Sequence, residues 1–221
     1  HAFDTSKSRV NLCGLVVSMA QGYQEKRQQK KKSGGQIYLD NSATTKVCEE
    51  AAEKMVDMMV RCYGNPSSIH QMGFEAEQEM EAARETIAKY IGAKPGEITF
   101  TSCGTEANNL AIFGAVQARR HSGNRVVTTA IEHPSVLQCM YQLEKRGYEV
   151  VRLQPDHTGH ISEEELSEAI NDKTVLVSMM LVNNEVGTIQ PIETAAKIIA
   201  RKKSPAILHV DAVQAFGKLP I

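Results

Sequence analysis

The sequence lacks a long apolar run and has almost no net charge. Its 25 lysines and arginines nearly balance its 26 aspartates and glutamates, which leaves a formal net charge of −1. A balance of this kind gives no indication of a nucleic-acid partner. No apolar stretch reaches the roughly 20 residues that a membrane-spanning helix needs. We therefore expect a chain that binds neither nucleic acid nor a membrane.

Cysteines with the spacing of a metal or redox motif are also missing. The five cysteines are odd in number and scattered, and no two have C-x-x-C spacing; they are Cys13, Cys48, Cys62, Cys103 and Cys139. This pattern predicts neither a metal site nor a disulfide framework. Reduced thiols in the cytoplasm are the ordinary state of such cysteines. No G-x-G-x-x-G follows a strand-like run, which argues against a Rossmann dinucleotide site.

The composition is that of a globular protein, with 42% hydrophobic and 23% charged residues in a chain of 221. This length suits one sizeable α/β domain, or one domain with part of another. Residues 1–36 differ from the rest, because a short apolar patch is followed by the basic run Gln24–Lys32. We expect them to form a disordered basic tail, although the patch also faintly imitates a signal peptide. Residues 37–95 are predicted to form an N-terminal arm with helices, and residues 96–221 a large domain.

Short apolar runs alternate with helix-like segments from residue 97 onward. Several runs are continuously apolar, which is typical of strands that are covered on both faces. The alternation predicts an α/β fold with a mostly parallel sheet flanked by helices. The expected strands are 97–101, 125–130, 149–153, 175–181 and 206–210, with helices at 105–120, 134–146, 162–170 and 192–203. Ahead of these we expect a short strand at 37–39 and helices at 46–61 and 73–90.

The stretch Phe100–Leu110 joins an expected strand to an expected helix through the turn Ser102-Cys103-Gly104. A strand that leads through small residues into a helix leaves free backbone N–H groups, and these suit a phosphate. Gly104 permits a close approach of the backbone, and the Thr105 hydroxyl adds a donor. The alternative is an ordinary strand-to-helix turn in which Thr105 only caps the helix.

Polar side chains follow three other expected strands as well. Glu132-His133, Asn183-Asn184 and the pair Asp211 and Gln214 each come directly after a strand-like run. Each has a structural alternative, since His133 and Asp211 could be helix caps, the asparagines could stabilise a turn and Gln214 could be a surface residue. In open parallel sheets, however, ligands bind beyond the carboxyl ends of the strands. Polar residues at four neighbouring strand ends therefore predict one binding site.

These side chains suit an aromatic cation that carries a phosphate. The Gly104-Thr105 turn would hold the phosphate, and the His133 imidazole would stack on the ring. The Asp211 carboxylate would keep a ring nitrogen protonated, because a nearby opposite charge favours the charged form. The amides of Asn184 and Gln214 would donate to a ring oxygen. Pyridoxal 5'-phosphate (PLP) has all of these features, and its electron-sink chemistry needs a carboxylate at the ring nitrogen.

Six motifs together resemble the cysteine desulfurases of the NifS/IscS type, which are class-V aminotransferase-like, fold-type-I PLP enzymes. The resemblance runs from about Ile37 to Ile221, with the motifs in order and at sensible spacing. It implies a PLP-binding large domain over residues 96–221. The motifs are Ile37–Thr45, Gly64–Ser68, Phe100–Leu110, Glu132-His133, Val182–Gly187 and His209–Lys218.

The resemblance also implies an activity and a set of roles. Sulfur is removed from L-cysteine to give L-alanine and an enzyme persulfide, which supplies acceptors such as an iron–sulfur scaffold or tRNA thiolation. A homodimer in the cytoplasm is implied too. Carried over by motif, Gly104-Thr105 holds the phosphate, and His133 stacks on the ring and helps to move protons. Asp211 pairs with the ring nitrogen, while Asn184 and Gln214 contact the ring oxygen.

Three positions depart from the family pattern. The family's Schiff-base lysine follows a histidine, but no His-Lys dipeptide occurs here, and Lys218 belongs to a different motif. None of the five cysteines matches the family's persulfide cysteine, and Cys103 stands where glycine is common. We therefore expect the sequence to be an N-terminal part of a longer enzyme, truncated within the large domain and inactive alone. The alternatives are a selenocysteine lyase, another fold-type-I PLP enzyme, or a non-catalytic dimerisation or binding module.

Overall fold

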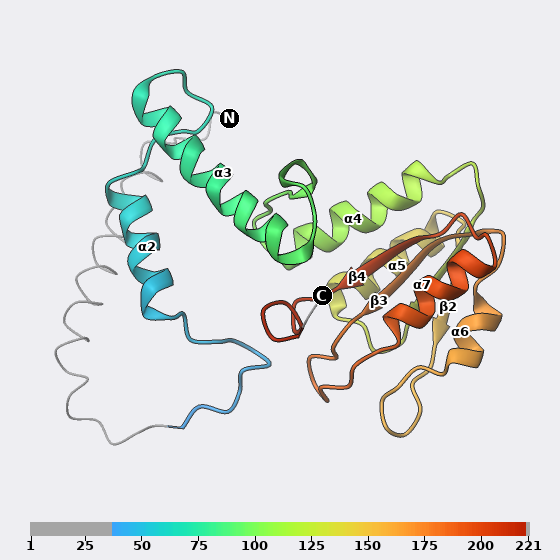
Figure 1. Ribbon diagram of the computed structural model, residues 1–221. Helices are drawn as coiled ribbons and strands as arrows, with labels where there is room; N and C mark the ends of the chain where they lie inside the picture. Colours follow the sequence, from blue (N-terminus) through green and yellow to red (C-terminus); the bar gives the residue numbers. More distant parts are fainter. Residues whose placement is uncertain (1–36, 220–221) are drawn as a thin grey trace, which may run out of the picture. The chain divides into compact units, whose positions relative to one another are not determined.

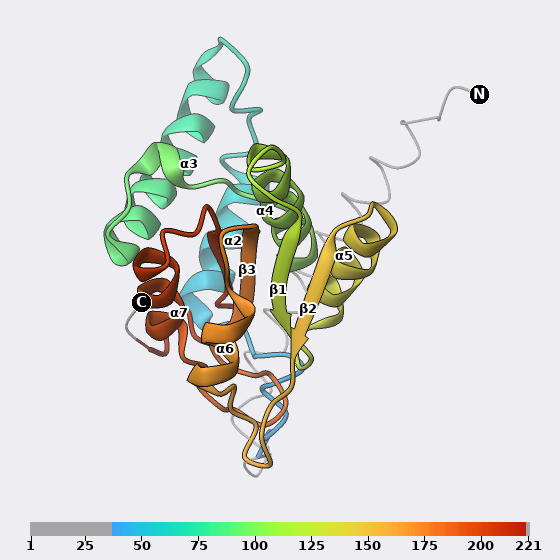
Figure 2. The same cartoon turned by 90° about the vertical axis from the view of Figure 1, so that its right-hand side faces the viewer.

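Four parallel strands form one sheet in the order β2-β1-β3-β4. Figure 1 labels β2, β3 and β4 of this sheet. Figure 2 shows β3, β1 and β2 side by side in this order. A parallel sheet follows from the sequence, because each strand is separated from the next by a helix that can make the crossover. The prediction of a mostly parallel α/β sheet is confirmed. The strands are β1 Arg125–Thr129, β2 Glu149–Leu153, β3 Thr174–Met180 and β4 Ile207–Asp211.

The computed structural model describes residues 37–219. The chain divides into two compact units, His1–Ile98 and Thr99–Ile221, and the sheet lies in the second. The tail predicted for residues 1–36 lies outside the described residues. The expected boundary at residue 95 remains a prediction.

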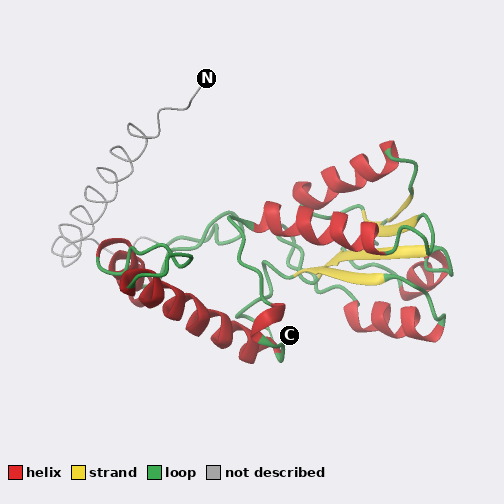
Figure 3. Ribbon diagram, turned by 90° about the horizontal axis from the view of Figure 1, so that it is seen from above, coloured by secondary structure: helices red, strands yellow, loops and turns green. Residues whose placement is uncertain are grey.

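Helices cover both faces of the sheet (Figure 3). On one face, Ile112 and Val116 of α4 (Gly104–Ala118) pack with Met140 and Leu143 of α5 (Pro134–Lys145) and with the sheet. On the other face, Leu166 of α6 (Glu163–Ala169) and Ile198 of α7 (Ile192–Arg201) form a second cluster. All seven residues of β3 are buried between these layers. The carboxyl edge of the sheet is thereby held rigidly from both sides.

The first unit contains α2 (Glu49–Val60), α3 (Gln71–Ile91) and the short 3₁₀-helix η1 (Pro95–Glu97). Lys54 of α2 contacts Glu79 of α3 at 2.7 Å, an exposed ion pair that contributes little stability. The helix α3 ends at Gly92, whose φ of 68° is the left-handed conformation that favours glycine. Of the described helices, none combines the length and apolar character needed to cross a membrane.

Two of the expected strands are wrong. Residues 37–39 are irregular, and the segment expected at 97–101 begins in η1 and continues without regular structure. A strand exists only when a neighbouring strand pairs with its backbone, and the four described strands pair among themselves. The proline that opens η1 lacks an N–H group and has a fixed φ, which favours the tight turn over an extended start. The other expected elements form, with ends that differ by a few residues.

Candidate cofactor site

The carboxyl ends of β1, β3 and β4 carry the predicted polar residues to the same edge of the sheet. Glu132-His133 follows β1, Asn183-Asn184 follows β3, and Asp211 is the last residue of β4. Parallel strands end at one edge, so this convergence is a direct consequence of the sheet topology.

The helix α4 starts beside this edge without a side-chain cap. Its N-cap is Cys103, no side chain accepts a hydrogen bond at that position, and Gly104 and Thr105 are exposed. The alternative in which Thr105 is the N-cap is therefore wrong, because Thr105 lies inside the first turn. The first-turn N–H groups of a helix have no intrahelical acceptor and favour an anion. A Cβ atom on Gly104 would lie 3.6 Å from Val213 Cγ2, so the helix start contacts the turn after β4.

Two neighbouring groups indicate that hydrogen-bond donors around this helix start favour negative charge. The backbone N–H of Glu106 and the side chain of Ser102 lower the pKa of the Cys103 thiol. The Glu106 carboxylate accepts from Ser102 Oγ and from Ser102 N, both at 2.6 Å, and these bonds lower its pKa. Amides that stabilise a thiolate at Cys103 are suited to stabilise phosphate oxygens in the same place.

Asp211 is a buried carboxylate whose two oxygens are both held. It is 8% exposed, Asn108 Nδ2 donates to its Oδ2 at 2.9 Å, and Val213 N donates to its Oδ1 at 3.1 Å. Two donors from different elements fix the orientation of the carboxylate at the end of β4. The bond from Val213 N belongs to the turn that follows β4, and no helix begins among residues 212–219, so the alternative of Asp211 as a helix N-cap is wrong.

His133 is the N-cap of α5, as its structural alternative predicted. Its Nδ1 accepts from Ser135 N at 3.1 Å and lies 2.8 Å from Ser135 Oγ. The residue remains exposed, and it lines a cavity of about 580 Å³ together with Asn184 and the loop 155–159. Capping uses only Nδ1, so the ring and Nε2 remain available to a ligand.

Of the three amide residues at this edge, Asn183 has a structural role, and Asn184 and Gln214 are candidates for contacting a ligand. Asn183 is buried and stabilises its turn, since its Oδ1 accepts from Glu185 N and Val186 N, both at 2.9 Å. Asn184 lines the cavity beside His133. Gln214 Oε1 accepts from Lys218 Nζ at 3.1 Å, which orients its amide. The roles of Asn184 and Gln214 toward a ligand stay predictions.

Sequence reasoning missed Asn108 and Ser135, which are buried beneath the site. Asn108 lies in the same helical stripe as the buried Ile112 and Val116, at a spacing of four residues. Ser135 stands four residues before the buried Cys139. A polar residue in an apolar stripe is a signal of an internal hydrogen-bond partner. This signal was available from the sequence, but the partners were not.

Glu132 is the other residue whose environment only the structure reveals. It is 4% exposed, and its Oε1 accepts from Thr129 Oγ1 at 2.7 Å and from Met180 N at 2.9 Å. Within residues 37–219, the buried side-chain oxygens that lack a hydrogen-bond partner are Glu132 Oε2 and Thr128 Oγ1. Burial raises the pKa of Glu132 to about 7, with a further contribution from the nearby charge of Asp211.

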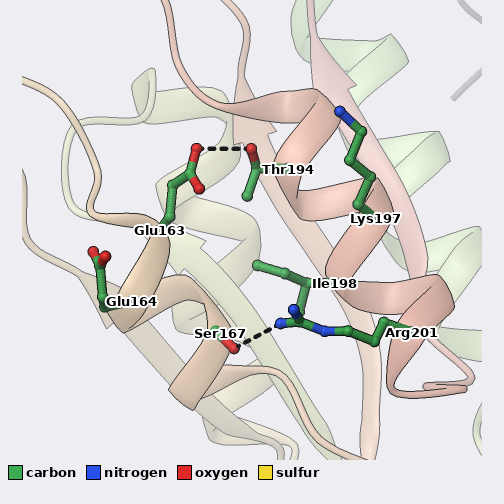
Figure 4. Close-up of a pocket in the computed structure, with 7 residues that line it drawn as sticks. All are labelled: Glu163, Glu164, Ser167, Thr194, Lys197, Ile198 and Arg201. Atoms are coloured by element: carbon green, nitrogen blue, oxygen red, sulfur yellow. Dashed lines mark hydrogen bonds between the residues drawn. The ribbon is translucent and has the colours of Figure 1, made fainter.

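A second cavity, of about 590 Å³, lies between α6 and α7 and contains none of the predicted site residues (Figure 4). Glu163 accepts there from Thr194, and Arg201 donates weakly to Ser167. Its lining carries two carboxylates and two cations, Glu163, Glu164, Lys197 and Arg201, so it favours neither sign of charge. In the described part of the chain, no cluster of three His, Cys, Asp or Glu side chains could hold a metal ion.

The chain belongs to the aminotransferase class-V family, which matches residues 37–221. Among its relatives, the cysteine desulfurase IscS of Glaesserella parasuis is 47% identical over 188 residues, which cover 84% of this chain and 46% of that protein. IscS of Methanosarcina thermophila is 45% identical over 185 residues, covering 84% of this chain and 45% of the relative. The chain thus spans about half the length of the curated relatives it matches.

Solved structures agree with this assignment. A NifS-like protein superimposes with a TM-score of 0.81 at 42% identity, covering 85% of this chain and 51% of that one. A structure described as SspA in complex with cysteine gives a TM-score of 0.78 at 38% identity, covering 84% and 53%. The resemblance to NifS/IscS-type proteins that the motifs predicted is therefore confirmed at the level of family and fold.

Proposed function

We propose that this chain supplies the PLP site of a cysteine desulfurase. The observation that carries the proposal is the buried Asp211 carboxylate, fixed by Asn108 and Val213 beside the uncapped start of α4. An anion site and a fixed carboxylate at one sheet edge match the two charges of PLP, its phosphate and its ring nitrogen. The names of the relatives support the same reading.

The residues present fit PLP. The first-turn amides at Gly104 and Thr105 would bind the phosphate, since the N–H groups at a helix start favour an anion. The His133 ring would stack on the pyridine, and the amides of Asn184 and Gln214 would contact its ring oxygen. Asp211 would hold the proton of the ring nitrogen in place. When bound, PLP supplies an electron sink for the bonds at the substrate's α-carbon.

The substrate and the partners belong to the same proposal. The C–S bond of L-cysteine would break as its sulfur bonds to an enzyme cysteine thiol, which leaves L-alanine and an enzyme persulfide. That sulfur would then pass to an acceptor such as an iron–sulfur scaffold or to tRNA thiolation. We further propose a homodimer and a cytoplasmic location, the ordinary setting of scattered unpaired cysteines. Assaying alanine release from L-cysteine and from L-selenocysteine with the full-length polypeptide separates a desulfurase from a selenocysteine lyase.

Cofactor binding by this chain is the direct test of the proposal. The chain is titrated with PLP and, separately, with pyridoxal, which lacks the phosphate, and absorbance is recorded. We expect saturable binding of PLP and much weaker binding of pyridoxal, because the helix start contributes only when the phosphate is present. Equal binding of both compounds, or binding of neither, would contradict a phosphate site at the start of α4.

Replacing His133 by Asn is expected to weaken PLP binding roughly 2- to 10-fold and to shift its absorption band. Loss of an aromatic stack of about 0.5–1.5 kcal/mol gives this range. Asparagine is a good N-cap, so the variant keeps the acceptor for Ser135 N and isolates the ring. His121→Asn, at an exposed site after α4, is the matched control. An unchanged affinity and spectrum in His133→Asn would limit His133 to helix capping.

A further inference from the structure

A continuous line of hydrogen bonds joins Asp211 to His133. Asn108 Nδ2 donates to Asp211 Oδ2 at 2.9 Å and to Ser135 Oγ at 3.0 Å. Ser135 Oγ in turn lies 2.8 Å from His133 Nδ1. Asn108 and Ser135 are 6% and 7% exposed, so water has little access to the middle of the line. The line runs from β4 through α4 to the start of α5.

The chemistry of the four groups fixes the direction in which each bond donates. A carboxylate only accepts, so the group of Asn108 that faces Asp211 is the NH₂. The second hydrogen of that NH₂ points to Ser135 Oγ, which therefore accepts from Asn108. The Ser135 hydroxyl then has its own hydrogen for His133 Nδ1. Ser135 N also donates to Nδ1 at 3.1 Å, so this nitrogen carries no proton. The proton of the neutral imidazole is thus on Nε2.

We propose that Asn108 and Ser135 are positioning residues, which orient the Asp211 carboxylate and hold the His133 proton on Nε2. The inference rests on the proposed function, because these two ends of the line are the groups assigned to the ring nitrogen and the ring face of PLP. The buried amide of Asn108 and the buried hydroxyl of Ser135 would then set the orientation of the Asp211 carboxylate and the tautomer of His133. Their contribution is indirect, since the line itself lies beneath the site.

The tautomer of His133 can be measured in the chain without any cofactor. Nitrogen-15 NMR of histidine-labelled protein at alkaline pH distinguishes a protonated Nδ1 from a protonated Nε2. The signal of His133 is identified by its loss in His133→Asn. We expect wild-type His133 to carry its proton on Nε2. A wild-type signal with the proton on Nδ1 would overturn the proposal without the use of any positioning variant.

Variants then test whether the Ser135 hydroxyl, rather than a change in the fold, sets the tautomer of His133. In Ser135→Ala, the loss of one donor to Nδ1 is expected to raise the share of the Nδ1–H tautomer about five-fold, the effect of one hydrogen bond. Asn108→Leu keeps the volume but removes both donors, and a shift in the same direction is expected. Ser135→Thr retains a hydroxyl and is expected to restore the wild-type signal. Asn109→Leu, one position further along α4, is the matched control, since Asn109 Nδ2 donates to Thr105 O instead.

The two levels of the proposal fail in different ways. If Ser135→Ala and Asn108→Leu fold normally by circular dichroism and leave the His133 signal unchanged, the positioning role is wrong. Should Asn108→Leu unfold, Ser135→Ala and Ser135→Thr decide the question. A parallel titration with PLP tests the function separately. Correct tautomer shifts in a chain that does not bind PLP would overturn the proposed function while the hydrogen-bond line stands.

Discussion

Asp211→Asn is expected to lower cysteine turnover by the full-length polypeptide roughly 10- to 1000-fold. An opposite charge within a few ångströms typically moves a pKa by about 1–3 units. Loss of the Asp211 carboxylate would therefore reduce the protonated fraction of the PLP ring nitrogen by the corresponding factor. The prediction depends on Asp211 being the buried, oriented anion at the end of β4. Alanine formation at saturating L-cysteine is the measurement.

The fold should survive this substitution. An asparagine oxygen can still accept from either Asn108 Nδ2 or Val213 N, so one of the two donors keeps its partner, and the expected cost is about 1–3 kcal/mol. Thermal unfolding checks this point. Asp172→Asn is the matched control, because Asp172 is exposed and precedes β3 at the opposite end of the sheet. Near-normal turnover by a folded Asp211→Asn enzyme would contradict the assignment of the PLP site.

Glu132→Gln is expected to change how stability depends on pH. Burial raises the pKa of Glu132 to about 7 from its ordinary 4.5. The folded state therefore holds this proton where the unfolded chain releases it. The contribution of Glu132 to stability is complete below pH 4.5 and is lost as pH rises toward 7, by roughly 3 kcal/mol in all. Glutamine does not titrate and keeps an oxygen for Thr129 and Met180, so the variant should lose this dependence.

Urea unfolding of wild type and Glu132→Gln at several pH values tests the expectation. The difference between the two proteins, rather than either curve alone, isolates Glu132, because other carboxyl groups also titrate. The free energy of unfolding of the variant should increase relative to that of wild type as pH rises from 4.5 to 8. Glu168→Gln, an exposed position on α6, is the control and should leave the pH dependence unchanged. Parallel pH curves for wild type and Glu132→Gln would mean that Glu132 is ionised in the folded protein.

Local patterns predicted the sheet and the positions of most site residues. The largely apolar run at β3 and the alternation of strand-like and helix-like segments favoured a covered parallel sheet. Since parallel strands end at a common edge, His133 and Asp211 were expected to converge. Of their alternative roles, that of His133 was right, because His133 caps α5, whereas no helix begins after Asp211 in the described residues.

Residues 97–101 mark the limit of such patterns. Their alternating apolar character is typical of a strand, yet pairing depends on a neighbour that no local pattern specifies. Thr105 shows the same limit at shorter range, since the choice of N-cap between Cys103 and Thr105 depends on where the first helical turn closes.

The sequence by itself determined the fold class, the family resemblance and which residue types gather at the sheet edge. These follow from the order of residues along the chain, because periodicity and the succession of strand-like and helix-like segments are local properties. Only the tertiary structure decided that Asn108 and Ser135 link Asp211 to His133 and that Glu132 is buried with an unpartnered oxygen. Asn108 and Asp211 are 103 positions apart. The hydrogen bond between them, and the desolvation that raises the pKa of Glu132, exist only once α4, α5 and the sheet pack together.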